Sequence, residues 1–347
     1  MQRLRSESEI IRSWCGAFEN VVVSIACITF NHESFIENAI ISFLMQKTDF
    51  PFEVLIYDDA STDKTASIIK KYAEKYPSII KPVLQTENQF SRGVKVNPKF
   101  NFSRAQGEYI ALCEGDDYWI DSKKLSKQVT AFEDGVSLIH SDVDSLNMLG
   151  GKSTILESVN KTRNRVGLAG DLRADAWLRA HSIFTCTMMF KKIDIIEYID
   201  TGVLEIDFWA GDYSMFLFLS QKGNIKYLDC STAVYRTANG SIMNQKNKSN
   251  LIEMQLKNLN LLSFYFSYFD VSRDIKDKAY GKIKKEIRKR VFLYSERNSI
   301  FEYRSYFNYF QYWQFKIFRF LKINKLNLIY MDLKSFVKKK VYYKNIA

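Results

Sequence analysis

The sequence predicts an α/β protein whose mostly parallel, Rossmann-like sheet carries helices on both faces and is followed by a helical appendage. Three observations lead to this prediction. From residue 21 to residue 140, short apolar runs alternate with segments of helical periodicity, as in a parallel sheet with crossover helices. The apolar runs are rich in β-branched residues, which is typical of strands buried on both faces. From residue 250 onward, only helical periodicity remains.

The first strand is expected at residues 21–28, and a helix follows it directly. Ser34 and Glu37 have the spacing of a capping box, and apolar residues recur behind them at helical period. Further strands are expected at 52–57, 79–84, 109–113 and 136–140, with helices after residue 58 and at 98–105 and 122–133. Because strands and helices alternate, the strands are expected to lie parallel.

The chain after residue 140 is less regular. Residues 152–170 are polar and weakly periodic, which predicts a mobile loop. Helices are then expected at 171–180 and 208–221, and extended stretches at 184–190, 225–228 and 233–235. Beyond residue 250 the pattern predicts long helices with breaks near Asp270, Asn298 and Asn324.

At 347 residues the chain is longer than a usual single domain. We expect an amino-terminal extension (1–20), an α/β domain (21–249) and a helical, basic and aromatic region (250–347). The first residues are charged and lack the apolar core of a signal sequence, and no window holds the roughly 18 apolar residues of a membrane span. The five cysteines are widely spaced, which argues against a disulfide framework or a zinc site. A cytoplasmic protein is therefore expected.

The net charge of +11 is unevenly distributed along the chain. The excess of Lys and Arg lies after residue 250, whereas the first 250 residues are close to neutral. A basic and aromatic end on a nearly neutral body favours a docking region over a nucleic-acid-binding protein. Two alternatives stay open for it: contact with the anionic inner face of the cell membrane, as a peripheral protein, or packing of its aromatic residues against protein.

Three acidic residues, Glu114, Asp116 and Asp117, follow the apolar run 109–113 directly. In open α/β sheets, ligands bind at the carboxyl ends of the strands. Adjacent carboxylates repel each other unless a cation neutralises them, and hard oxygen ligands suit Mg²⁺ or Mn²⁺. The alternative is a solvated acidic turn, since Gly and Asp are common in turns.

Two other loops are expected at the same edge of the sheet. Thr29 and Phe30 follow the first strand, and Asp58 and Asp59 follow the second. A nucleotide fits such a set of loops, because one group of acids can accept hydrogen bonds from a base or ribose while the other holds a metal on a diphosphate. There is no Gly-x-Gly-x-x-Gly or Gly-Lys-Ser/Thr sequence after the first strand, which disfavours a dinucleotide cofactor and a P-loop nucleotidase.

The chain from residue 21 to about residue 243 resembles the family 2 inverting glycosyltransferases, which have the A-type nucleotide-sugar fold. Four motifs carry the resemblance: Val-Ser-Ile-Ala-Cys-Ile-Thr-Phe-Asn-His (23–32), Tyr-Asp-Asp-Ala-Ser-Thr-Asp-Lys-Thr (57–65), Ala-Gln-Gly-Glu-Tyr-Ile-Ala-Leu-Cys-Glu-Gly-Asp-Asp-Tyr-Trp (105–119), and Ala-Gly-Asp-Tyr (210–213) followed by Val-Tyr-Arg-Thr-Ala-Asn-Gly-Ser (234–241). The resemblance implies a metal-dependent enzyme of surface-polysaccharide assembly. Such an enzyme moves a sugar from a nucleotide diphosphate, usually a UDP-sugar, to a hydroxyl of a glycan or lipid-linked acceptor, with inversion.

The resemblance also implies roles for single residues. Asp212 matches the catalytic base of the family, and Asp116 and Asp117 resemble its Mn²⁺ or Mg²⁺ ligands. The residues that match nucleotide contacts are Thr29, Phe30, Asp58, Asp59, Asn88, Asp116 and Arg236. Ala238 departs from the family pattern, which often has a His there, and this predicts a weaker grip on the diphosphate.

Two rival functions are weighed against the transferase. A sugar nucleotidyltransferase also binds nucleotides on an α/β sheet, but it needs a Gly-rich basic loop after the first strand, and residues 29–33 do not form one. A membrane-docked scaffold without activity would not need intact acids at positions 58, 59, 116, 117 and 212. No partner among nucleic acids is expected, because no recognition motif accompanies the basic charge.

Overall fold

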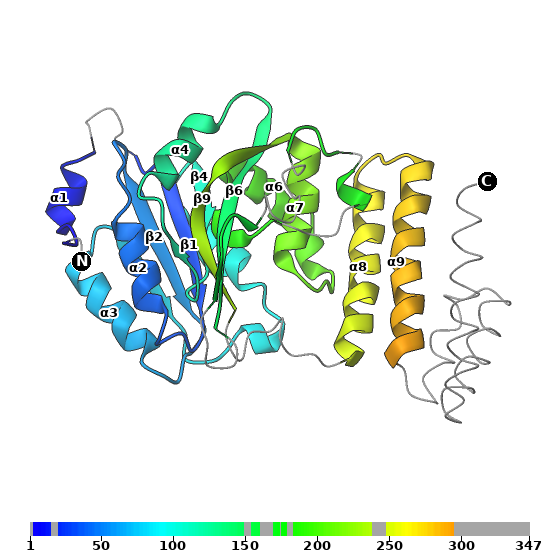
Figure 1. Cartoon of the computed structure of the whole chain (residues 1–347), viewed down its shortest axis with the longest axis horizontal. Helices are drawn as coiled ribbons and strands as arrows, with labels where there is room; N and C mark the ends of the chain where they lie inside the picture. Colours follow the sequence, from blue (N-terminus) through cyan, green and yellow to red (C-terminus); the bar gives the residue numbers. More distant parts are fainter. Residues whose placement is uncertain are drawn as a thin grey trace. The chain divides into compact units, whose positions relative to one another are not determined.

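The computed structural model describes residues 3–14, 20–148, 154–159, 169–173, 175–178, 183–237 and 248–294 (Figure 1). The chain divides into two compact units. Residues 1–245 and 261–275 form the first unit, and residues 246–260 and 276–347 form the second. The sheet and all described candidate site residues belong to the first unit.

In the described residues the first unit contains one sheet with strand order β3-β2-β1-β4-β8-β6-β9-β5, and β7 pairs with β6. The strands are β1 (Val23–Thr29), β2 (Phe52–Asp58), β3 (Ile80–Leu84), β4 (Tyr109–Leu112), β5 (Tyr118–Trp119), β6 (Val136–Asn147), β7 (Thr154–Leu156), β8 (Met189–Lys191) and β9 (Asn224–Thr237). β3, β2, β1 and β4 are parallel neighbours, as are β6 and β9. The antiparallel ladders hold only two or three residue pairs each. The predicted α/β class with a mostly parallel sheet is confirmed.

Helices flank the sheet in the first unit (Figure 1). They are α1 (Glu7–Ile11), α2 (Ile36–Leu44), α3 (Thr65–Lys75), α4 (Lys124–Ala131), α6 (Lys192–Asp200) and α7 (Gly211–Lys222). Short helical turns lie between them: η1 (Phe90–Arg92), η2 (Asn97–Asn101), η3 (Phe102–Arg104), η5 (Ala176–Leu178), η6 (Thr185–Thr187) and η7 (Val203–Glu205). α8 (Lys248–Tyr268) and α9 (Arg273–Tyr294) confirm the predicted helical region and the break near Asp270, while the breaks near Asn298 and Asn324 lie outside the described residues.

The core of the first unit lies around β1 and β2, whose side chains are almost all buried. α2 and α3 pack together beside these strands and bury apolar faces against them. Phe43 of α2 makes an edge-to-face contact with Trp119 of β5, with ring centroids 4.9 Å apart. This contact joins α2 to the strand that follows the acidic turn.

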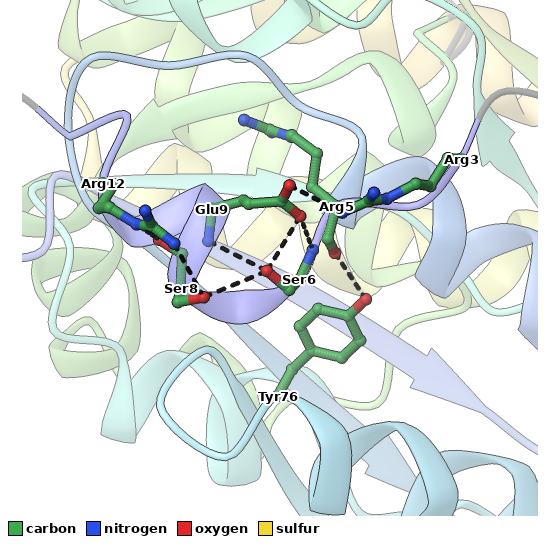
Figure 2. A network of polar contacts seen from close by, with 7 residues as sticks. All are labelled: Arg3, Arg5, Ser6, Ser8, Glu9, Arg12 and Tyr76. Carbon is green, nitrogen blue, oxygen red and sulfur yellow. Dashed lines mark hydrogen bonds and ion pairs between the residues drawn. The ribbon is translucent and has the colours of Figure 1, made fainter.

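The amino-terminal helix α1 begins with a capping box (Figure 2). Ser6 Oγ accepts a hydrogen bond from Glu9 N at 3.3 Å, and the Glu9 carboxylate accepts one from Ser6 N at 2.7 Å. The hydrogen bonds from Ser6, with help from Arg3, lower the pKa of Glu9 to about 2. Ile10 is fully buried in the core of the first unit, so the predicted extension folds as part of that unit.

Polar contacts attach α1 to the ends of α2 and α3. The Arg5 guanidinium donates to Gln46 O. Arg5 O accepts from Tyr76 Oη at 2.7 Å (Figure 2). Glu7 Oε1 accepts from Ser78 N at 2.6 Å. One short helix therefore joins two segments that are separated by about thirty residues of sequence.

The region after residue 250 contributes in part to the first unit. Leu261, Leu262 and Tyr265 of α8 are fully buried, and Tyr265 Oη donates to Ser214 O of α7 at 3.0 Å. Trp177 packs against Phe266, with ring centroids 5.3 Å apart. Residues 261–275 therefore belong to the first unit, whereas the residues after 294 lie outside the described part of the chain.

Several predicted elements differ from the structure. α2 begins at Ile36 without a side-chain cap, so the predicted capping box at Ser34 is wrong; Phe35 N instead donates to His32 O. Within residues 171–180, the described part holds only the short turn η5. The predicted extended stretch 184–190 contains the turn η6 and then the first two residues of β8. The predicted strands 225–228 and 233–235 are one strand, β9, with shifts of register opposite β6. Most of the predicted loop 152–170 lies outside the described residues, and β7 lies within it.

Among the helices that the structure describes, none combines the length and the apolar character needed to cross a bilayer.

Candidate active site

The acidic motif forms a tight turn at the carboxyl end of β4. Gly115 N donates to Ile28 O at 2.9 Å, and Asp117 N donates to Glu114 O at 3.1 Å. A Cβ atom on Gly115 would lie 2.6 Å from Thr29 Oγ1, closer than side chains normally approach. The absence of a side chain at 115 therefore lets the turn after β4 lie against the loop after β1, as predicted for the strand ends.

We expect Gly115→Ala to separate these two loops. The added methyl group would also meet the buried Thr29 Cβ at 2.7 Å, so the loops would have to shift. Overpacking of this kind costs about 1–3 kcal/mol. Denaturant unfolding should show that loss, and nucleotide binding should weaken with it. Gly93→Ala is a comparison at a glycine with no heavy atom within 4 Å of the added methyl, although its positive φ adds strain.

The carboxyl groups of the turn lie in protein and affect each other. Burial, with a contribution from the nearby Asp116, raises the pKa of Glu114 to about 7, although Thr185 Oγ1 donates to its carboxylate at 2.8 Å. Asp117 is almost completely buried, and burial followed by the charges of Asp116 and Glu114 raises its pKa well above the ordinary value. Asp116 is the most open of the three, with 35% of its side chain exposed. A positive charge brought to this turn would relieve the repulsion.

Arg236 of β9 holds the acidic turn through two hydrogen bonds. Its backbone N donates to Asp117 Oδ1 at 2.8 Å, and its guanidinium Nη1 donates to Asp116 O at 2.8 Å. The guanidinium lies 4.2 Å from the ring centroid of Tyr118 and 5.3 Å from that of Phe35. The structure thus brings Arg236 to the acidic turn, where its backbone N and its guanidinium both donate hydrogen bonds, and the nucleotide contact that the resemblance implied stays a prediction. Ala238 lies outside the described residues.

His32 is a site residue that the sequence reasoning did not select. Its Nε2 atom lies 3.9 Å from Asp116 Oδ2, and burial lowers the pKa of the imidazole below its ordinary value. His32 Nδ1 and Thr29 Oγ1 are both buried without a hydrogen-bond partner. The position of His32, three residues after Thr29 in the loop after β1, is the signal that could have indicated it.

Asp58 is the last residue of β2 and Asp59 follows it, and both are buried. Asp59 accepts hydrogen bonds from Tyr57 Oη and from the backbone amides of Gln89 and Phe90, at 2.7–3.0 Å. Both its carboxylate oxygens therefore bind the protein. Asn88 closes the same turn, because Nδ2 donates to Asp59 O and Oδ1 accepts from Ser91 N.

The remaining residues of the candidate nucleotide site also lie at this edge. Burial raises the pKa of Asp58, although Ser61 donates to its carboxylate through both N and Oγ. Phe30 is 43% exposed, so an aromatic face is available beside the acids. The parallel pairing of β1 with β2 puts Thr29 directly beside Asp58. The hydrogen bonds of Arg236 bring β9 to Asp116 and Asp117.

Asp212 lies in the first turn of α7, partly buried. Its Oδ1 accepts from Tyr213 N at 2.8 Å. The charge of Asp212 contributes to the raised pKa of both Glu114 and Tyr198, so Asp212 lies within electrostatic reach of the acidic turn. A base held there can serve a reaction centre next to the acids.

A cation fits this site only with help from a ligand. In the part of the chain that the structure describes, no three His, Cys, Asp or Glu side chains are arranged to hold a metal ion. Asp116 and Asp117 supply hard carboxylate oxygens, and Mg²⁺ commonly uses one or two carboxylates together with substrate phosphates and water. The mutual repulsion of these acids agrees with that use. The pair therefore fits a cation whose coordination a phosphate group completes.

Lys124 is the first residue of α4, the helix that follows the acidic turn in the chain, and it is fully buried. Its Nζ donates to Gln128 Oε1 at 2.5 Å and lies 4.4 Å from the ring centroid of Trp119. Burial lowers its pKa from 10.5 to about 8. The unfolded chain thus binds more protons between these values, so the free energy of unfolding rises with pH in that window.

We expect the rise between pH 8 and pH 10.5 to be about 3 kcal/mol. Denaturant unfolding at a series of pH values measures it, and Lys124→Met, which cannot be protonated, should lack this component. An identical pH dependence in both proteins would show that Lys124 is not the group responsible.

Comparison with known proteins agrees with this geometry. Residues 24–195 match the family model described as Glycosyl transferase family 2. An uncharacterised protein of Mycobacterium tuberculosis is 36% identical over 223 residues, which are 62% of this chain and 58% of that protein. The poly(ribitol-phosphate) beta-N-acetylglucosaminyltransferase TarS of Staphylococcus aureus is 35% identical over 130 residues, 37% of this chain and 21% of TarS. The chain thus spans less than two thirds of the length of these relatives.

Two solved structures share the fold. TarS residues 1–349 in complex with UDP-GlcNAc gives a TM-score of 0.54 at 20% identity, over 81% of this chain and 75% of that chain. The mannosyltransferase PcManGT from Pyrobaculum calidifontis, in complex with GDP-Man and Mn²⁺, gives 0.52 at 14% identity, over 97% and 90%. The fold is therefore the A-type glycosyltransferase fold. Within it, residues 24–195 form a family 2 glycosyltransferase domain.

Proposed function

We propose that this protein is an inverting glycosyltransferase that moves a sugar from a nucleotide diphosphate donor, a UDP-sugar, to a hydroxyl of a glycan or lipid-linked acceptor in surface-polysaccharide assembly. One observation supports this proposal best. Asp116, Asp117 and Asp212 all lie within electrostatic reach of Glu114, which follows β4. The relationship to TarS supports the substrate class.

In this proposal each group has one task. Asp212 accepts the proton of the acceptor hydroxyl. At the same time the hydroxyl oxygen bonds to the anomeric carbon, and the bond from that carbon to the diphosphate breaks. A divalent cation bound at Asp116 and Asp117 would neutralise the negative charge of the leaving diphosphate. Phe30, Asp58 and the turn at Asn88 would form the base and ribose side of the donor site. Arg236 holds the acidic turn in place through its contacts with Asp116 and Asp117.

A panel of nucleotide-sugars, tested by thermal shift with and without Mn²⁺, examines this proposal. A donor at 100 times its Kd stabilises the folded protein by about 2.7 kcal/mol, which gives a clear rise in Tm. We expect a UDP-sugar to do so only when Mn²⁺ or Mg²⁺ is present. A nucleotidyltransferase would instead form a nucleotide-sugar from a nucleoside triphosphate and a sugar phosphate, and a scaffold would show no turnover with any donor.

We also propose that the basic region contacts an anionic membrane from the cytoplasmic side. In the described part of region 250–347, the helix α9 exposes Lys282, Lys284, Lys285 and Lys289. Each basic residue near such a surface contributes about 1 kcal/mol. Sedimentation of the full chain with phosphatidylserine vesicles, at low and high salt, compares the wild type with a variant in which these four lysines are Gln. Removal of everything after residue 250 is unsuitable, because Tyr265 is part of the first unit.

A further inference from the structure

The segment of residues 88–101, between β3 and β4, is attached to the sheet at both ends. At one end the backbone amides of Gln89 and Phe90 donate hydrogen bonds to the Asp59 carboxylate, at 2.7 Å and 3.0 Å. At the other end the fully buried Asn101 donates through Nδ2 to Cys27 O of β1 at 3.2 Å. Phe100 stacks on Tyr57 of β2, with ring centroids 4.6 Å apart. The 88–101 segment is thus a firm part of the donor side of the site.

The middle of this segment contacts the turn that leads into α7. Lys95 Nζ donates to Phe208 O at 3.4 Å and lies 4.1 Å from the centroid of the Phe208 ring. One ammonium group therefore binds both the backbone and the side chain of one residue. Phe208 is only 3% exposed and the contact is partly buried, and partial desolvation strengthens the attraction between a cation and an aromatic face.

The start of α7 lacks a side-chain cap of its own. Ala210 is the N-cap residue and makes no side-chain hydrogen bond to the helix. Asp212 lies four residues after Phe208, in the first helical turn. The contacts of Phe208 are therefore well placed to determine where the carboxylate of Asp212 lies.

We propose that Lys95 is a positioning residue, which holds the turn before α7 so that Asp212 faces the sugar donor. Asp59 attaches the 88–101 segment to the nucleotide side of the site. Through Lys95 the same segment also fixes the position of Asp212 on the acceptor side. This inference rests on the proposed function, because it takes Asp212 as the base. A displacement of about 1 Å at a reacting group can lower a rate by about 100-fold.

The test uses three variants of the full chain. Lys95→Met removes the charge and keeps most of the side-chain stem, whereas Lys95→Arg keeps a cation that can bind the ring and the carbonyl. Lys99→Met is the matched control, since Lys99 lies in the same segment, 5.4 Å from the ring centroid of Phe100, but outside the contact with Phe208. We expect Lys95→Met to lower kcat at least tenfold with little change in the donor KM. Lys95→Arg should retain most of the activity, and Lys99→Met all of it.

Hydrogen exchange gives a readout that needs no substrate. Amides of residues 207–214 should exchange faster in Lys95→Met than in wild type or Lys99→Met, while those of β1 and β2 stay unchanged. A raised donor KM at constant kcat would make Lys95 a donor contact and overturn the proposal, as would unchanged exchange at 207–214. If no donor is turned over by the wild type, the proposed function fails, and the exchange measurement still decides whether Lys95 holds this turn.

Discussion

Asp212→Asn is expected to bind the sugar donor as wild type does and to transfer sugar about 10³ times more slowly. The amide keeps the size and shape of the carboxylate but cannot accept the acceptor's proton, and general base catalysis contributes about 10²–10⁴ in rate. The measurement combines donor-dependent thermal shift with single-turnover transfer, so that binding and chemistry are separated.

Two further variants sharpen this test. Asp207→Asn alters an exposed acid in the same turn and should retain full activity. Glu114 is the rival base, because its pKa of about 7 would let it accept a proton at neutral pH. Substantial turnover in Asp212→Asn, together with its loss in Glu114→Gln, would move the base to Glu114.

Asp116→Asn is expected to abolish the metal dependence of donor binding and to reduce donor affinity at least about 100-fold. Replacing a partner that only supports a metal ligand already costs about 10–100-fold in metal affinity, and Asp116 is proposed as a ligand itself. Its partly exposed side chain makes a loss of folding unexpected. Titration with UDP in the presence of Mn²⁺ or EDTA measures the effect.

Asp117→Asn should lose metal-dependent binding as well, but its effect on stability should differ from that of Asp116→Asn. Asp117 is buried and accepts a hydrogen bond from Arg236 N, so an amide there can disturb β9. Asp121→Asn is the control at an acid that pairs with Lys127 near the turn. Equal UDP affinity with and without metal, in wild type and both variants, would remove the metal from the proposal.

The central parallel strands β1 and β2 could be predicted because they are mostly apolar runs of seven residues that are buried on both faces. The helix α6 was not predicted, since Ile193 and Ile196 are exposed while Ile195 and Tyr198 are buried, which hides the helical period. The strand β8 is only three residues long and follows the turn η6 directly. Pairing with β4 and β6, which no local pattern encodes, determines it.

The candidate site shows the same division. The acids at 58, 59, 116 and 117 could be placed from their positions after strands, because parallel strands end at one edge. What these side chains bind depends on loops from elsewhere in the chain: Asp59 holds the turn at 89–90, and Arg236 comes from β9 to the acidic turn. His32 was not selected from the sequence, because its approach to Asp116 depends on the packing of two loops.

The attachment of α1 has a consequence for the order of events during synthesis. Glu7 finds its partners at Ser78 and Ile79, the latter 72 residues further along the chain. At a translation rate of 5–20 residues per second, those partners are made roughly 4 to 14 s after Glu7. Until α3 has been made, Ile10, which the finished core buries completely, lacks part of the apolar cluster that covers it. α1 can therefore dock in its final position only after α3 and the residues that follow it have been synthesised.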